Sequence, residues 1–147
     1  MFDEFLASLR CPACGAFVEE ATIQTHIRGI TADSSGVRVG FEFEPVDLTT
    51  DSILASGYAL IHQPDEGGLI RLLNVWGCPE CQTQQWARIE VSERRVHEIC
   101  AVELTYSALE SAHFICDTNA ELLAKSLAPD TASAEAVATL RRSLPNR

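Results

Sequence analysis

Two short cysteine turns are the residues of this chain whose types and spacing could do chemistry. Cys11 and Cys14 are separated by two residues, as are Cys78 and Cys81, and a proline follows the first cysteine of each pair. This spacing directs both thiols of a turn at one point, and two facing turns form the tetrahedral S₄ site that Zn²⁺ takes in closed structural sites. One such pair is weak evidence, whereas two of the same C-P-x-C form are strong. We therefore expect Cys11, Cys14, Cys78 and Cys81 to bind one Zn²⁺ ion.

The expected metal is structural, because four thiolates saturate a tetrahedral ion and leave no position for water or substrate. It would connect two distant turns and supply folding free energy on the order of 10 kcal/mol or more. Iron fits the same S₄ cage, because thiolate geometry alone does not choose between the two metals. A redox dithiol is the alternative, but redox pairs lie at a helix N-terminus after a strand, and both of these pairs look like β-turns. We expect no catalytic residue and no further cofactor.

The remaining cysteines and the tryptophans are interpreted as packing residues. Cys100 and Cys116 are single and have apolar neighbours, and free cysteine behaves as a small buried hydrophobe. Trp76 and Trp86 flank the second cysteine turn, where core packing is expected. An exposed tryptophan there would instead indicate a binding hot spot.

The histidines are far apart in the sequence and are interpreted as surface residues or hydrogen-bonded core residues. None belongs to an H-x-x-x-H motif or lies beside an obvious nucleophile. If the chain has a catalytic pocket, His62 with Asp65 and Glu66 is where we expect it, as a general-base arrangement at a strand end. The four positions concerned are His26, His62, His97 and His113.

Length and composition indicate one domain, or one domain with an appendage. The chain has 147 residues, of which 46% are apolar, and such a chain can bury a sizeable core. No apolar run approaches the roughly 20 residues of a membrane span, and Met1 to Arg10 lack the basic start and apolar run of a signal peptide. We therefore expect a cytoplasmic protein without membrane contact. In that reducing compartment, paired cysteines favour metal binding over disulfides.

The chain is strongly acidic. It carries 21 Asp and Glu against 11 Lys and Arg, a net charge of −10. A nucleic-acid binder needs a cationic surface to displace counterions, so nucleic acid is not an expected partner. The charge serves solubility, or it forms a docking surface for a protein with a basic surface. Glu19, Glu20, Glu42 and Glu44 would lie together on such a surface if the strands that carry them pair.

Apolar periodicity predicts a β domain followed by helices. Phe2, Phe5, Leu6 and Leu9 have helical spacing and predict a short N-terminal helix over residues 2–9. Alternation of apolar and polar residues predicts a hairpin of two strands and then a meander. The predicted strands span residues 16–30, 37–43, 58–62, 69–76, 86–91 and 96–104, and the predicted C-terminal helices span 105–115, 118–129 and 130–147.

The predicted fold class is α+β. Residues 1–104 are expected to form a zinc-stitched, mostly antiparallel β domain that includes the short N-terminal helix. Residues 105–147 are expected to form an extension of two or three short helices packed on that domain, because short amphipathic helices persist only when packed. The oligomeric state does not follow from the sequence.

The two turns, Cys11-Pro12-Ala13-Cys14-Gly15 and Cys78-Pro79-Glu80-Cys81, resemble the knuckles of the zinc-ribbon and rubredoxin-like class. From residue 11 to about residue 104 the chain also resembles small bacterial or phage proteins of uncharacterised function. These share a C-P-x-C-G turn, a strand pair, a second C-x-x-C and a final hairpin. The resemblance implies a zinc-ribbon-like β domain with a long insertion between the knuckles. It implies no particular function.

Four functions are compatible with these features. The first is a non-enzymatic interaction module, an adaptor or accessory subunit that binds another protein through its acidic surface. The second is an acidic inhibitor or immunity-type protein that blocks a basic site. The third is a small enzyme with its chemistry near His62, and the fourth is a nucleic-acid-binding zinc ribbon.

Overall fold

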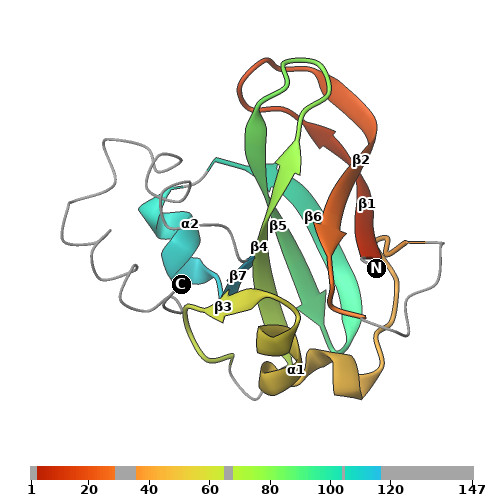
Figure 1. Ribbon diagram of the computed structural model, residues 1–147, viewed down its shortest axis with the longest axis vertical. Helices are drawn as coiled ribbons and strands as arrows, with labels where there is room; N and C mark the ends of the chain where they lie inside the picture. Colours follow the sequence, from red (N-terminus) through yellow and green to blue (C-terminus); the bar gives the residue numbers. More distant parts are fainter. Residues whose placement is uncertain (1–2, 29–35, 65–67, 104, 117–147) are drawn as a thin grey trace.

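The computed structural model describes residues 3–28, 36–64, 68–103 and 105–116 (Figure 1). These ranges form mainly β-strands, with short helices between them. The strands are β1 (Asp3–Arg10), β2 (Phe17–Thr25), β3 (Tyr58–Leu60), β4 (Leu69–Gly77), β5 (Gln84–Ser92), β6 (Arg95–Val102) and β7 (Phe114–Cys116). The helices are the 3₁₀ helix η2 (Pro45–Leu48) and the α-helices α1 (Thr50–Ala55) and α2 (Tyr106–Ser111).

The strands form two sheets. One is the antiparallel pair β1–β2, and the other has five strands in the order β3-β7-β4-β5-β6. The larger sheet is mixed: β7 runs parallel to β4, and all other neighbouring strands in this sheet are antiparallel. Figure 1 shows the β1–β2 pair lying against the larger sheet, with α2 beside the larger sheet and α1 at one end.

The main core fills the space between the two sheets. Alternation along each strand sends every second side chain inward, and these inward side chains are fully buried: Phe5, Ile23, Leu72 and Ile89. A second, smaller cluster lies on the other face of the larger sheet, where Leu73 and Trp86 pack with Leu109 of α2. The larger sheet is therefore covered on both faces at β4, which explains why consecutive residues Leu72 and Leu73 are both buried.

Residues 3–10 form a strand, and the predicted N-terminal helix is wrong. The strand has a register shift between Ala7 and Leu9, and Leu6 is buried on the face opposite Phe5. Residue 36 covers Leu6 there, because a Cβ built at Gly36 would lie 2.5 Å from its Cδ1. Burial on both faces and the shift together produce apolar spacing that imitates a helix.

Residues 37–43 were predicted to form a hairpin with the strand before them, and this prediction is wrong. β2 pairs with β1 instead, and segment 37–43 crosses from one sheet to the other. At one end Val37 exchanges backbone hydrogen bonds with Glu4 and Leu6 of β1, and at the other Phe41 and Phe43 bond to the β6 side of the larger sheet. Val37 and Phe43 are buried in the main core and Phe41 packs against it, whereas Val39 is 57% exposed. The apolar alternation of this segment therefore does not indicate membership of either sheet.

The predicted α+β class with two or three C-terminal helices is wrong for the described residues. These are mostly β, and Phe114–Cys116 form strand β7 in place of the end of a helix. β7 lies between β3 and β4, so Phe114 enters the main core while Ile115 enters the second cluster. The predicted start of α2 is confirmed, because the Thr105 side chain accepts a hydrogen bond from the Ala108 N–H.

The helices predicted over 118–129 and 130–147 lie outside the described residues, and the domain boundary expected at residue 104 stays a prediction. Within the described part of the chain, no helix combines the length and the apolar character needed to cross a membrane.

Candidate metal centre

Each cysteine turn closes a β-hairpin. The first lies between β1 and β2 and the second between β4 and β5, and both are at the same end of the molecule (Figure 1). In each turn the backbone N–H of the first cysteine donates a hydrogen bond to the carbonyl of the residue five positions later. These pairs are Cys11 with Ala16 and Cys78 with Thr83. The carbonyl of the first cysteine accepts the N–H of the residue four positions later, which is Gly15 or Gln82.

The two turns therefore have the same backbone conformation. Gly15 and Gln82 hold equivalent positions, with φ of 76° and 58°. Glycine adopts this left-handed conformation without steric cost, whereas glutamine adopts it with strain. Glycine at position 15 therefore suits the turn that holds Cys14.

The four cysteines predicted as metal ligands come together. Their Sγ atoms all lie within 4.8 Å of one another, with 3.7 Å between Cys11 and Cys81 and 3.8 Å between Cys14 and Cys78. A tetrahedral ion with Zn–S bonds of about 2.3 Å separates its ligand sulfurs by about 3.8 Å, whereas a disulfide bond is only about 2.0 Å long. The cluster thus has the size of an S₄ metal site, and its thiols are unbonded to one another.

Neighbouring groups shift the pKa values of two of these thiols in opposite directions. The pKa of Cys81 is lowered to about 6, chiefly because the Thr83 hydroxyl lies 2.9 Å from its sulfur. For Cys14, a backbone hydrogen bond from Ala16 lowers the pKa, but desolvation and the three neighbouring thiols raise it to about 12. Four adjacent thiolates repel one another, and a bound divalent ion compensates that repulsion.

The cluster is covered on one side only. Cys11 and Cys78 are buried, whereas Cys81 is half-buried and Cys14 is exposed. Arg10 donates a hydrogen bond to the Gly15 carbonyl and lies 5.6 Å from the Phe17 ring centroid. Trp76 is buried and donates its indole N–H to the Trp86 carbonyl. The expectation that both tryptophans pack in the interior is confirmed.

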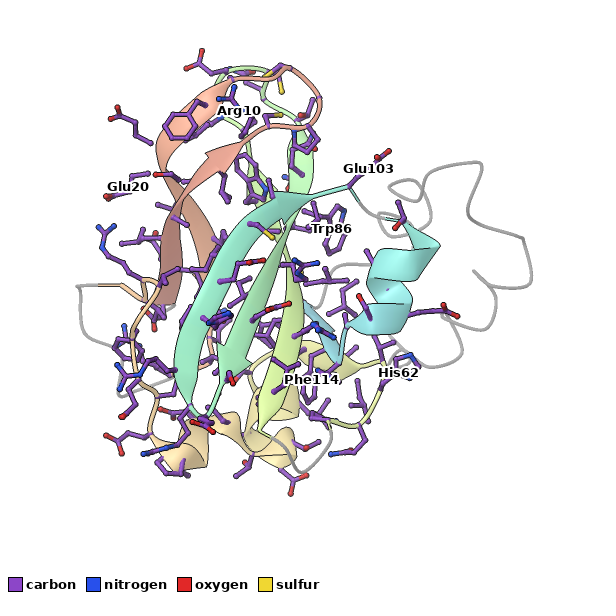
Figure 2. The ribbon with its side chains drawn as sticks, turned by 180° about the vertical axis from the view of Figure 1, so that it is seen from behind. Arg10, Glu20, His62, Trp86, Glu103 and Phe114 are labelled. Atoms are coloured by element: carbon purple, nitrogen blue, oxygen red, sulfur yellow. The ribbon has the colours of Figure 1, made fainter. Side chains whose placement is uncertain are left out.

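The other predicted candidates lie away from this centre. His62 is exposed and at the far end of the molecule from Arg10 and the cysteine turns (Figure 2). Its proposed carboxylate partners, Asp65 and Glu66, lie outside the described residues. Cys100 is half-buried with its thiol 3.3 Å from Glu98 Oε1, and Cys116 is half-buried with its sulfur accepting the Val75 N–H.

The acidic cluster expected on strand pairing is not present. Glu20 forms an ion pair with Arg38, and Glu42 lies 3.8 Å from Arg95. Because residues 37–43 bridge to β1 and β6 and do not pair with β2, the four glutamates do not gather on one sheet face.

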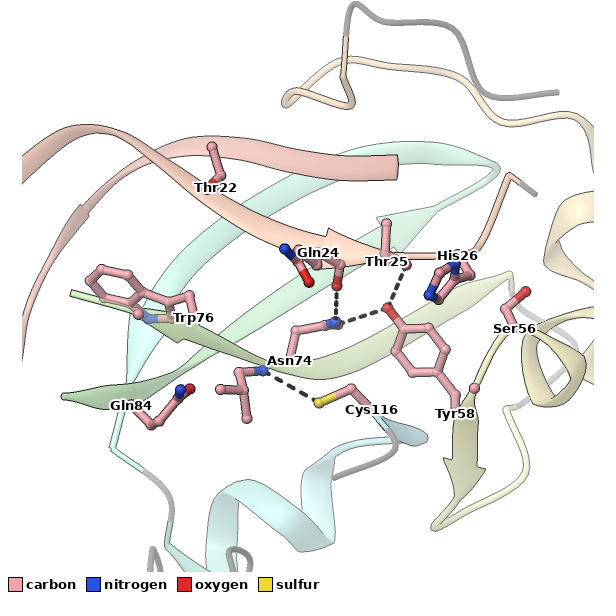
Figure 3. Close-up of a pocket in the computed structure, with 13 residues that line it drawn as sticks. Thr22, Gln24, Thr25, His26, Ser56, Tyr58, Asn74, Trp76, Gln84 and Cys116 are labelled. Carbon is pink, nitrogen blue, oxygen red and sulfur yellow. Dashed lines mark hydrogen bonds between the residues drawn. The ribbon is translucent and has the colours of Figure 1, made fainter. Parts of the chain in front are cut away.

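A cleft between the two sheets was missed by sequence reasoning. Its volume is about 670 Å³, and it lies where β2 passes β4 (Figure 3). At its floor the Tyr58 hydroxyl donates to Asn74 Oδ1 and lies 2.9 Å from the Thr25 hydroxyl. Burial raises the pKa of Tyr58 above its ordinary value, so this hydroxyl remains protonated. No local pattern indicates the cleft, because its residues come from five separate strands and two loops.

A buried ion pair was missed as well. Arg28 makes a bidentate contact with Asp3, with Nη2 2.9 Å from Oδ1, and both side chains are nearly inaccessible. The guanidinium also lies 4.7 Å from the Phe41 ring centroid. Alternation predicts Arg28 on the exposed face of its strand, but β2 ends at Thr25 and the side chain turns inward.

Comparison of the chain with protein-family models, with curated proteins and with solved structures finds no match. The resemblance to zinc ribbons therefore extends to the cysteine turns and their clustering, and membership of a zinc-ribbon family is not supported.

Proposed function

We propose that this chain is a non-enzymatic, zinc-stabilised protein-interaction module that acts as an adaptor or accessory subunit. The observation that carries the proposal is the cluster of four cysteine sulfurs within 4.8 Å of one another. Four thiolates fill every position of a tetrahedral ion, so a zinc bound there has no site for water or substrate. Its role would be to fasten the β1–β2 hairpin to the β4–β5 hairpin.

The distribution of charge supports a basic partner. The described ranges contain no lysine, and each of their seven arginines lies against a group of the same chain. Those contacts are Arg10 with Gly15, Arg28 with Asp3, Arg38 with Glu20, Arg71 with Glu90, Arg88 with Glu98, and Arg94 and Arg95 with Glu42.

Several exposed carboxylates form no ion pair with any arginine of the described ranges. These are Glu19, Glu44, Asp51, Glu80, Glu93, Glu103 and Glu110. A surface with surplus carboxylates and occupied arginines attracts cations and repels phosphate backbones. This favours a basic protein over a nucleic acid. The same surplus suits an inhibitor that covers a basic site, and the identity of the partner separates that alternative from an adaptor.

The test is to isolate the chain from its own cells, tagged and at its natural level, and to measure the mass of the complex at low and high salt. We expect about one equivalent of zinc, which elemental analysis separates from iron, and a complex of fixed stoichiometry with a basic protein. The complex should weaken as salt screens the charges. A doubly neutralised variant, Glu19→Gln with Glu44→Gln, should bind less tightly. Recovery of the chain without any protein partner at low salt contradicts the proposal.

A further inference from the structure

The cleft between the sheets lacks the carboxylates that dominate the charge of the chain. Its lining holds hydroxyl, amide, imidazole and thiol groups but no Asp, Glu, Lys or Arg. Thr22, Gln24 and His26 line it from β2 and the residues that follow, and Asn74 lines it from β4. A site of this composition suits an uncharged ligand that offers both hydrogen-bond donors and acceptors.

One wall of the cleft is an outer strand edge. In β1, the Leu6 N–H and the Glu4 carbonyl point away from β2, since both are hydrogen-bonded to the backbone of Val37. The register partners of Glu4 and Leu6 on β2 are Gln24 and Thr22. In an antiparallel pair, opposite residues either exchange backbone hydrogen bonds or both point away from each other. The backbone N–H and C=O groups of Thr22 and Gln24 therefore point outward, into the cleft.

The opposite wall is a second strand edge. Among the residues that the structure describes, β7 pairs with β4 at Leu72 and Leu73 alone. Beyond that point the Val75 N–H donates to the Cys116 sulfur at 3.4 Å, a weak acceptor in the place of a backbone carbonyl. Gly77 continues this edge along the cleft.

The two sheets are joined differently on their two sides. On the side of β1 and β6, segment 37–43 links them through backbone hydrogen bonds. On the side of β2 and β4, the two sheets are linked through side chains: the Asn74 amide donates to the Gln24 carbonyl at 3.3 Å, and the Tyr58 hydroxyl lies 2.9 Å from the Thr25 hydroxyl (Figure 3). One side is thus closed by main chain, and the other leaves main-chain groups facing a cavity.

We propose that this cleft binds an extended segment of a partner polypeptide, which adds as a strand to the outer edge of β2. The proposal rests on the proposed function and names the site and the kind of partner. Strand addition obtains affinity from main-chain hydrogen bonds, which any sequence can supply, and specificity from pockets for alternate side chains. The uncharged lining selects uncharged side chains, and the net charge of −10 favours Lys or Arg in the flanking parts of the segment.

A sugar is the alternative ligand for a polar cleft with a tryptophan. Recognition of a sugar ring by stacking needs an open aromatic face. Trp76 is only 2% exposed, and its indole N–H is occupied by the Trp86 carbonyl. The cleft therefore offers main-chain edges and no stacking platform, which favours a peptide.

Selection from a display library of short random peptides, with the zinc-loaded full chain as the target, tests the proposal. We expect enriched peptides, and we expect their binding to shift the backbone amide resonances of Thr22 and Gln24 and to slow hydrogen exchange of these amides. No enrichment, or changes confined to another surface, overturns the proposal. A glycan array that binds the chain at these residues, when no peptide does, overturns it also.

A matched pair of variants at Thr22 isolates the main-chain contribution. Thr22→Pro removes the outward N–H and leaves the β1 pairing intact, because proline is tolerated on an edge strand whose N–H faces away from the sheet. Thr22→Val keeps the N–H. We expect peptide affinity to fall about tenfold in Thr22→Pro and to stay near the parent value in Thr22→Val. Thermal melting and zinc content check that both variants are folded.

The two proposals fail separately. A cellular partner that binds the parent chain and Thr22→Pro with equal affinity preserves the interaction module but refutes the cleft as its site. A parent chain without any partner, in contrast, removes the basis of both.

Discussion

Replacing Cys78 by serine tests how much the metal centre contributes to the fold. Cys78 and Cys14 are 64 positions apart, and their sulfurs lie 3.8 Å apart. A link across a loop of that length restricts the unfolded chain by about 4 kcal/mol on chain entropy alone. The full free energy of zinc binding to such a site is on the order of 10 kcal/mol or more. Total stabilities of domains are only about 5–15 kcal/mol.

We therefore expect Cys78→Ser to lower the melting temperature by at least about 8–16 °C, since 1 kcal/mol corresponds to about 2–4 °C for a chain of this size. Circular dichroism melting with parallel zinc analysis measures this, and a chelator added to the parent protein should reproduce the shift. Cys100→Ser is the matched control, because Cys100 lies outside the cluster and its thiol contacts Glu98. A Cys78→Ser protein that melts within the error of the parent would refute the metal centre as a stabilising element.

Three further substitutions follow from the structure. Asp3→Asn removes the carboxylate that makes a bidentate contact with the buried Arg28 and should cost about 3–5 kcal/mol in urea unfolding. Glu20→Gln, at an exposed pair, should cost under about 1 kcal/mol; equal losses would contradict this. Tyr58→Phe should cost about 1–3 kcal/mol at neutral pH, because two buried polar groups lose a partner. Because burial raises the pKa of Tyr58 in the folded protein, the unfolded chain loses the Tyr58 hydroxyl proton at a lower pH than the folded chain does. Parent stability should therefore fall by up to about 1.4 kcal/mol per pH unit above about pH 10, and Tyr58→Phe should lessen that slope when unfolding is followed at several pH values. Gly15→Ala should cost about 1 kcal/mol in thermal melts, because φ is 76° there while the space beside it is open; an unchanged melting temperature would exclude that strain.

The cysteine cluster and several strands were predictable because they depend on local patterns. The C-P-x-C spacing predicts two thiols at one point, and the structure brings the two turns together. Strands β4 and β5 lie close to their predicted positions, since apolar runs of that length on either side of a cysteine turn favour a hairpin. The start of the helix predicted from residue 105 is also local, because the Thr105 side chain caps α2.

The failures occur where distant parts of the chain decide the outcome. Apolar spacing over residues 2–9 has a helical period, yet burial of Leu6 beneath residue 36 makes the segment a strand covered on both faces. Phe114 and Ile115 fit a helix by composition, but insertion between β3 and β4 buries one on each side of the sheet. Periodicity records which residues are buried and does not record what covers them.

The sequence alone determined the four cysteines that could hold a metal, the acidic balance and the hairpin that carries the second cysteine turn, because each depends on residue type and short spacing. Only the tertiary structure decided that β2 pairs with β1, that Arg28 is buried against Asp3, and that two strand edges face an uncharged cleft. Pairing partners, buried charges and clefts arise from residues far apart in the chain, and the free energy that selects them comes from packing between elements and not from any one segment.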